Sequence, residues 1–218
     1  MKSIRLAPVK VPKALTTAIV DACKKLAPDC HPQFIERRPE TSAVINKCTF
    51  NVRSYLDAHP GEMVMGWEVC IWEGVMLECI GHSVVRTDGA LVCISPSAYG
   101  DQNLLFLPDP RLVFDFNDPM ARMPTKQIAI SQRPEVHRLI EVEAAELAIK
   151  IKYPVSTGTL VVGGEDANLL STFAREKQRL MLKIVLATND HASKCFCGSG
   201  KKFRKCHQAD IEHMLRFS

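Results

Sequence analysis

Apolar side chains recur at helical spacing in four parts of the chain. Each of these stretches places its apolar residues along one side of a helix, as an amphipathic helix requires. Pro134 is typical of a first helical turn, and His59-Pro60-Gly61 is typical of a helix end. The predicted helices cover residues 14–26, the stretch from Thr41 to about 58, a helix from Pro134, and about 167–187.

Between residues 63 and 107 the pattern changes to short runs rich in Val, Ile, Trp and Leu, which predict antiparallel strands. Asp88-Gly89 is a strong two-residue hairpin signal, so Thr87 is expected to face Ala90. Counting back from that pair places His82, Cys93 and Ser95 on one face of the sheet. The predicted strands are Met63–Glu73, Met76–Thr87, Ala90–Ser95 and Leu104–Leu107, whereas residues 30–40 and 108–133 are interpreted as loops.

These elements predict an α+β protein in which a helix packs on an antiparallel sheet and C-terminal helices support it. The main domain is expected over 1–188, with its core at 41–117 and helical support at 134–188, followed by a separate tail at 189–218. Of the 218 residues, 46% are hydrophobic and 24% are charged, as in ordinary soluble domains. No apolar run is long enough to cross a bilayer and no signal peptide is recognisable, so we expect a cytoplasmic protein without a membrane partner.

Nine cysteines are present, and in a reducing compartment they are more typical of metal ligands, reactive thiols or buried apolar residues than of disulfides. Residues 195–207 read Cys-Phe-Cys-Gly-Ser-Gly-Lys-Lys-Phe-Arg-Lys-Cys-His. Structural zinc sites fill four tetrahedral positions with Cys and His, and the glycines allow the chain to fold back between them. The motif therefore predicts a structural zinc site with the ligands Cys195, Cys197, Cys206 and His207.

Residues 194–208 resemble the SEC-C motif, which is found at the C-terminus of the preprotein translocase ATPase and of many bacterial proteins. In the translocase this module binds a chaperone and the ribosome, so the resemblance implies docking on a protein, ribosome or RNA partner. Five basic residues surround the predicted ligands here and leave two interpretations open, a solvated charged surface or a docking surface for RNA or an acidic protein. These residues are Lys194, Lys201, Lys202, Arg204 and Lys205.

A second candidate site combines Cys48, early in a predicted helix, with His82 on a predicted strand. A helix start lowers a thiol pKa, and an imidazole can serve as the base of a cysteine nucleophile. Ser95 or Cys93 would then orient the imidazole imperfectly, since an acidic or amide group is the usual partner. The alternative interpretation is that Cys48 is a small buried residue and that His82 has a purely structural hydrogen bond.

This order of a helical cysteine, a histidine on a strand and a following strand resembles the papain-like and transglutaminase-like cysteine fold. The stretch from Gly66-Trp67-Glu68 to Leu91-Val92-Cys93-Ile94-Ser95-Pro96 also resembles uncharacterised bacterial proteins that carry an aspartate at the position of Cys93. The resemblance implies a cysteine-dependent hydrolase or acyltransferase. The competing hypothesis is a non-catalytic binding protein that docks through its zinc-binding tail. The sequence indicates neither a substrate nor an oligomeric state.

Overall fold

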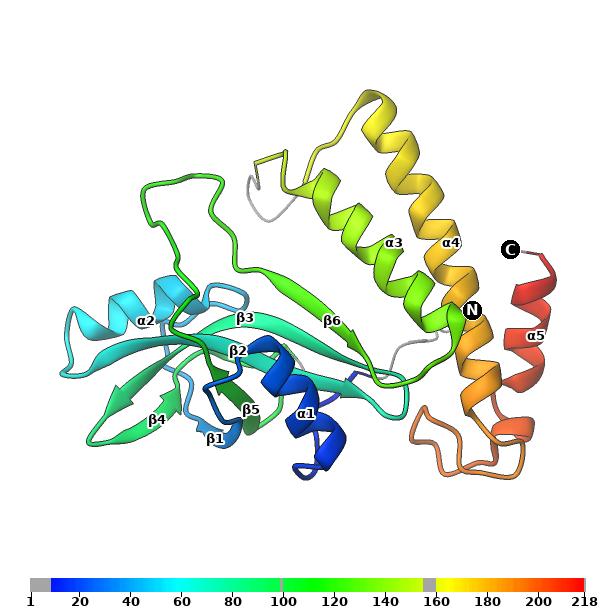
Figure 1. The fold of residues 1–218 in the computed structure, drawn as a ribbon, viewed down its shortest axis with the longest axis horizontal. Helices are drawn as coiled ribbons and strands as arrows, with labels where there is room; N and C mark the ends of the chain where they lie inside the picture. The colour runs from blue at the N-terminus through cyan, green and yellow to red at the C-terminus, as the bar shows by residue number, and fades with distance from the viewer. Residues whose placement is uncertain (1–8, 99, 155–159, 218) are drawn as a thin grey trace. The chain divides into compact units, whose positions relative to one another are not determined.

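The computed structural model describes residues 9–98, 100–154 and 160–217, and the chain divides into two compact units. The barrel unit contains residues 10–71 and 77–128, and it carries most of the β-structure (Figure 1). The helical unit contains Trp72–Met76 and the chain from Ala129 onward, together with Val9. Among the described residues, none of the helices is both long enough and apolar enough to span a membrane.

Six strands form one sheet in the order β2-β5-β1-β4-β3-β6, and an additional pairing of β2 with β3 closes five of them into a barrel. The sheet is mixed rather than antiparallel as predicted, because β1 and β4 run parallel whereas β1–β5, β2–β5 and β3–β4 are antiparallel. The strands are β1 (Gln33–Arg37), β2 (Glu62–Trp72), β3 (Met76–Thr87), β4 (Ala90–Cys93), β5 (Asn103–Pro108) and β6 (Thr125–Ala129). The α+β composition is therefore confirmed, but strands β1 and β6 lie in segments that were interpreted as loops.

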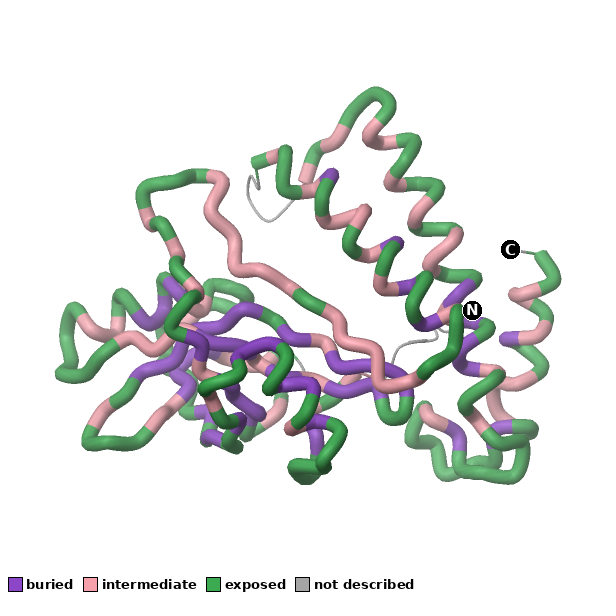
Figure 2. The backbone as a smooth tube through the Cα atoms, viewed as in Figure 1, coloured by how far each residue is buried: buried purple, intermediate pink, exposed green. Residues whose placement is uncertain are grey.

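The inner and outer sides of the barrel have different packing partners. Inside, Ile35, Val84, Leu104 and Phe106 are buried against one another, and buried residues make up most of β3 and β5 (Figure 2). Outside, Val52 of helix α2 (Cys48–Leu56) packs on Val85 of β3 and Ile94. The neighbouring residues Val84 and Val85 of β3 thus pack on opposite sides of the sheet, as strand geometry requires.

Two helices belong to the barrel unit, and both begin later than the sequence pattern predicts. Helix α1 (Thr17–Leu26) starts where the Thr16 side chain accepts a hydrogen bond from the Ile19 amide. Helix α2 begins at Cys48 rather than near Thr41, because the preceding residues form turns in which Asn46 adopts a positive φ of 63°. Cys48 consequently occupies the first position of its helix.

The helical unit consists of a pair of long helices, a segment of residues 189–207 that we call the knuckle, and a short C-terminal helix. Its elements are α3 (Pro134–Lys150), α4 (Gly164–Thr188), the short 3-10 helix η1 (Phe203–Lys205) and α5 (Gln208–Arg216). One buried cluster joins Leu139 of α3, Leu182 and Ile184 of α4, Phe203 of η1 and Ile211 of α5. The tail is therefore part of the same core as α3 and α4.

Candidate metal centre and the barrel cysteines

The tail folds into a tight hairpin that brings its cysteines together. The amide of Cys195 donates to the carbonyl of Lys201 at 2.8 Å, and the amide of Phe203 donates to the carbonyl of Ser193 at 2.9 Å. Gly198 and Gly200 both have a φ of 75°, a left-handed conformation that disfavours other residues. The two glycines thus allow the chain to reverse within a few residues, as the sequence predicts.

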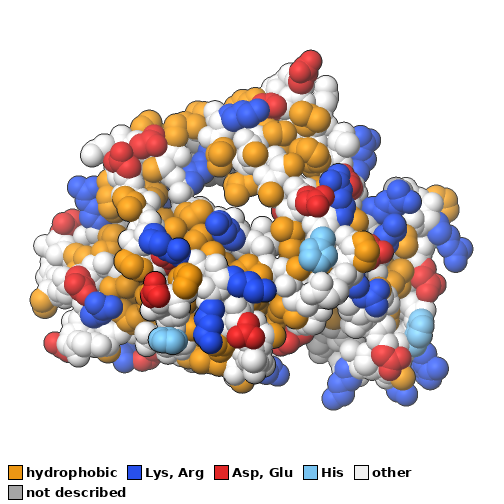
Figure 3. Space-filling view, viewed as in Figure 1, with side chains coloured by type: hydrophobic (Ala, Val, Ile, Leu, Met, Phe, Trp, Pro, Cys, Tyr) orange, Lys and Arg blue, Asp and Glu red, His pale blue; other side chains and the backbone are white. Residues whose placement is uncertain are grey.

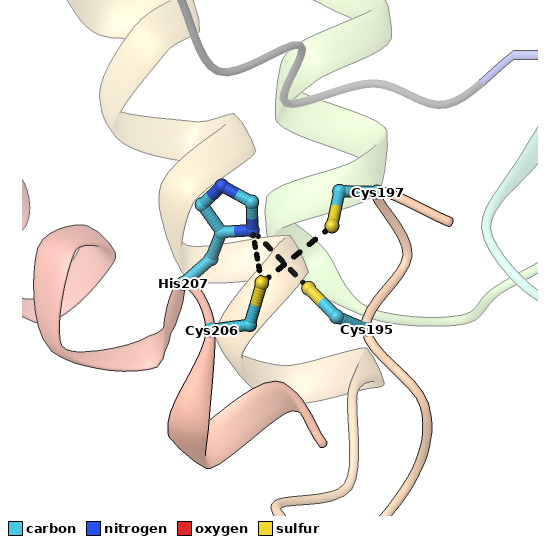
Figure 4. A group of neighbouring side chains, drawn as sticks. All are labelled: Cys195, Cys197, Cys206 and His207. Atoms are coloured by element: carbon cyan, nitrogen blue, oxygen red, sulfur yellow. Dashed lines mark hydrogen bonds between the residues drawn. The ribbon is translucent and has the colours of Figure 1, made fainter. Parts of the chain in front are cut away.

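Four side chains from this hairpin and the residues that follow it converge (Figure 4). Nδ1 of His207 lies 3.2 Å from Sγ of Cys195 and 3.4 Å from Sγ of Cys206. Sγ of Cys197 lies 3.6 Å from Sγ of Cys206, and all four ligand atoms lie within 4.8 Å of one another. The structure therefore brings together all four residues that were predicted as ligands, in an arrangement that could hold a metal ion through Nδ1 of His207.

The environment of the cluster favours a thiolate at one position in particular. Hydrogen bonding from Ser199 lowers the pKa of the Cys197 thiol to about 6, whereas burial raises the pKa of Cys195 to about 11. Since a metal binds the deprotonated form of a thiol, the lowered pKa favours binding of a cation at Cys197. Binding at Cys195 would displace a proton.

Aromatic packing anchors the cluster to the helical core. Phe203 is fully buried, and Phe196 lies between it and His207, with ring-centroid distances of 6.1 Å and 5.6 Å respectively. The Phe196 ring is stacked on the His207 imidazole at an interplanar angle of 29°. This contact restricts the orientation of the imidazole, as groups around metal-bound histidines commonly do.

The second predicted site lies in the barrel, where the register of the β3–β4 hairpin agrees with the prediction. Thr87 pairs with Ala90, and Asp88 and Gly89 both have positive φ angles, as the turn requires. Nε2 of His82 lies 3.2 Å from Sγ of Cys93, and both residues are buried. The structure thus brings His82 and Cys93 together.

An ion pair that no sequence pattern predicted lies beside this histidine, with Arg37 buried and Glu68 partly buried. Arg37 donates from Nη2 to Oε1 of Glu68 at 2.6 Å, and from Nη1 to Sγ of Cys93 at 3.4 Å and the carbonyl of Ser95 at 3.2 Å. Oε2 of Glu68 lies 3.8 Å from Nδ1 of His82. Burial, assisted by the positive charge of Arg37, lowers the pKa of His82 well below its ordinary value, so the imidazole is neutral.

Ser95 and Cys48 lie at the edge of this network. The Ser95 hydroxyl accepts a hydrogen bond from the side-chain amide of Asn51 at 3.0 Å, which ties α2 to the end of β4. The Cys48 thiol interacts with the backbone of Ser83 and Thr49, and its pKa is raised because burial outweighs these contacts. Within the described part of the chain, no hydrogen bond joins Cys48 to His82.

No sequence signal identified Arg37 and Glu68, because the pair forms only when β1 and β2 come together in the barrel. Arg37 was assigned to a loop, and Glu68 was noted only as part of the stretch Gly66-Trp67-Glu68. The one indication that could have suggested a pair is Glu68, a charged residue between Trp67 and Val69 in a predicted strand, since a charge that is buried needs a partner.

Comparison with protein families shows that residues 193–209 match the SEC-C motif, which confirms the resemblance of the tail. The match covers the hairpin, the four clustered side chains and the first residues of α5. The chain matches no protein of curated function and no solved structure.

Proposed function

We propose that the helical unit binds a structural zinc ion through Cys195, Cys197, Cys206 and His207. With zinc bond lengths of about 2.3 Å to sulfur and about 2.0 Å to nitrogen, a tetrahedron places two sulfurs about 3.8 Å apart and a sulfur and a nitrogen about 3.5 Å apart. The separations of 3.6 Å between Cys197 and Cys206, and of 3.2 and 3.4 Å around His207, are close to these values. Four protein ligands leave no open position for water, which favours a structural role over catalysis.

The function of this zinc knuckle is docking on an anionic partner, for which RNA on the ribosome is the favoured candidate. The five basic side chains around the ligands are all exposed, and Figure 3 shows Lys and Arg side chains over the knuckle at its lower right. No acidic residue occurs between Asp190 and Asp210, so no neighbouring carboxylate in this segment offsets their charge. A dense group of cations on a rigid support suits phosphate contacts, which dominate RNA affinity. Because ribosomes lie in the cytoplasm, this partner implies a cytoplasmic location for the protein.

The zinc proposal is tested by measuring the metal content of the purified protein by mass spectrometry under native conditions. We expect one zinc per chain, and none in Cys206→Ser. The matched control is Cys30→Ser, because Cys30 is a free cysteine outside the knuckle. A chain that purifies with a different metal, or that retains its zinc after Cys206→Ser, contradicts the assignment.

The docking proposal is tested by fluorescence anisotropy with a labelled 20-nucleotide RNA and with purified ribosomes. We expect Lys201→Glu/Lys202→Glu to weaken binding at least tenfold and to reduce its salt dependence. Lys24→Glu/Lys25→Glu, on the exposed side of α1, makes the same charge change and should leave binding unaltered. Binding that both variants weaken equally, or no binding at all, would exclude RNA as the partner and favour an acidic protein.

The second hypothesis, a cysteine-dependent hydrolase with Cys48 as nucleophile and His82 as base, has less support. A nucleophile of this kind needs a thiolate, whereas burial raises the pKa of Cys48. Cys93, which faces His82, is itself a buried thiol whose pKa burial raises to about 11, so it supplies no negative charge to orient the imidazole. These observations favour the non-catalytic function.

Alkylation by iodoacetamide, followed residue by residue with mass spectrometry, separates the two hypotheses. We expect Cys48 to react no faster than the half-buried Cys70, with no change in His82→Gln. Fast alkylation of Cys48 below neutral pH that slows in His82→Gln would instead show a thiolate–imidazole pair and support the hydrolase.

A further inference from the structure

Three phenylalanine rings meet on the surface of the barrel unit, far from the knuckle in sequence. Phe50 comes from α2, and Phe114 and Phe116 come from the segment between β5 and β6. The ring centroids are 5.7 Å apart for Phe50–Phe114, 5.6 Å for Phe50–Phe116 and 5.0 Å for Phe114–Phe116. None of the three is buried, and 47% of Phe50 is exposed. Exposed aromatic clusters of this kind are typical of interaction surfaces.

Two cations complete this surface, which we call the Phe50 patch and define as Lys47, Phe50, Arg53, Phe114 and Phe116. Nζ of Lys47 lies 5.7 Å from the centroid of the Phe50 ring, and Cζ of Arg53 lies 4.9 Å from that of Phe116. Both cations are exposed, and in the described part of the chain neither forms an ion pair with a carboxylate. Their positive charge is therefore available to a partner.

We propose that the Phe50 patch is a docking site for an acidic peptide segment of a partner protein that also carries apolar side chains. Apolar side chains of the segment would cover the ring edges, while its carboxylates would pair with Lys47 and Arg53. A segment with both kinds of side chain complements the rings and the cations at the same time.

The geometry of the rings argues against single-stranded nucleic acid as the occupant. Stacking of bases requires an open ring face. Here the rings meet edge to face at interplanar angles of 71° to 89°, and the two cations cover a face of Phe50 and of Phe116. The faces of Phe50 and Phe116 are thus already occupied by a cation, which disfavours base stacking and leaves contacts of aliphatic and aromatic side chains as the favoured use of the rings.

Two acidic residues of the same segment form no ion pair with Lys47 or Arg53 in the part of the chain that the structure describes. Asp115 accepts a hydrogen bond from the amide of Asn117 at 2.8 Å, and Asp118 accepts one from the amide of Met120 at 2.8 Å. Both carboxylates thus bond to the turns of their own backbone and leave the two cations accessible to a partner. Val113, which precedes Phe114, is 83% exposed and extends the apolar character of the segment.

The test is selection of 12-residue peptides from a random display library on the full-length, zinc-loaded protein. We expect the selected peptides to be enriched in Asp and Glu interspersed with Leu, Ile or Phe. Synthetic copies should bind in an anisotropy titration, and Lys47→Glu/Phe50→Ser/Arg53→Glu should weaken binding at least tenfold. Lys24→Glu/Lys126→Glu reverses two exposed charges elsewhere in the barrel unit and should bind as the unaltered chain does.

Three outcomes overturn the proposal. Selected peptides without acidic enrichment, or acidic peptides that bind the triple variant as tightly as the unaltered chain, would show that the patch does not select this chemistry. Binding of a labelled U12 RNA that is lost in the triple variant but retained in Lys201→Glu/Lys202→Glu would assign the patch to nucleic acid instead. Phe50→Ser alone changes a single half-exposed side chain and should also weaken peptide binding, and urea unfolding verifies that this variant is folded.

Discussion

Removal of the metal should destabilise α3 and α4 as well as the knuckle itself. The knuckle and α5 contribute Phe203 and Ile211 to the core of the helical unit, and both are 0% exposed. Full burial of such side chains is worth about 1.5–3 kcal/mol each, so unfolding of the tail would cost this core about 3–6 kcal/mol. That is a large part of the 5–15 kcal/mol that typically separates a folded domain from its unfolded state.

Hydrogen exchange measured by mass spectrometry resolves this effect along the chain. After treatment with EDTA, we expect amides of α3 and α4 to exchange about 100-fold faster or more, which corresponds to a loss of about 3 kcal/mol. Amides of β4, β5 and the part of β3 beyond Met76 should keep their rates, because the two buried clusters that contain Val84 and Val85 include no residue of the knuckle.

The matched variants make the experiment independent of the chelator. Cys206→Ser should reproduce the exchange pattern of the EDTA-treated protein, whereas Cys30→Ser should behave as the unaltered chain does. Unchanged exchange in α3 and α4 after complete loss of the metal would show that these helices are stable without the knuckle. Faster exchange throughout the barrel would show that the two units unfold together.

Three further predictions concern the barrel and are checked by urea unfolding. In Gly66→Ala the new Cβ would lie 2.3 Å from the carbonyl oxygen of Leu107, so we expect a loss of about 2 kcal/mol or more, and an unchanged midpoint would contradict this packing. Glu68→Gln leaves the guanidinium of Arg37 buried without its counter-charge and should lower the free energy of unfolding by about 3 kcal/mol. The double variant Arg37→Met/Glu68→Met should restore most of this loss. Equal losses in both variants would argue against an ion-pair effect. Because the folded-state pKa of His82 lies well below the ordinary value of 6.5, the unfolded chain alone takes up this proton, so stability should be complete above about pH 6.5 and fall by up to about 1.4 kcal/mol per pH unit below it. His82→Gln should flatten that slope, and an identical pH profile in this variant would assign the effect to other groups.

The Cys/His cluster was predictable because it is local. All four ligands lie within 13 residues, and the Gly-Ser-Gly turn that separates them allows few other conformations. The β3–β4 hairpin was predictable for the same reason, since Asp88-Gly89 sets its register through the turn alone.

Features that depend on distant pairing were not predictable in this way. β1 has an exposed and polar first residue and two charged residues at its end, so its five residues show little of the apolar pattern of a strand. It is a strand because β4 and β5 pair with its two sides, and both lie more than 50 residues further along the chain. The buried contacts of Arg37 and the closure of the barrel follow from that pairing, which no local pattern reports.

The helical unit is assembled from pieces that are not contiguous in the chain. Trp72, Val75 and Met76, at the tip of the β2–β3 hairpin, are buried in the same cluster as α3, α4 and the knuckle. A fragment that starts at Ala129 would lack these three side chains and would leave the surface that they cover in contact with water. The helical unit therefore cannot be transferred to another protein as one contiguous stretch of the chain. A version that folds on its own would need other apolar side chains in place of the hairpin tip.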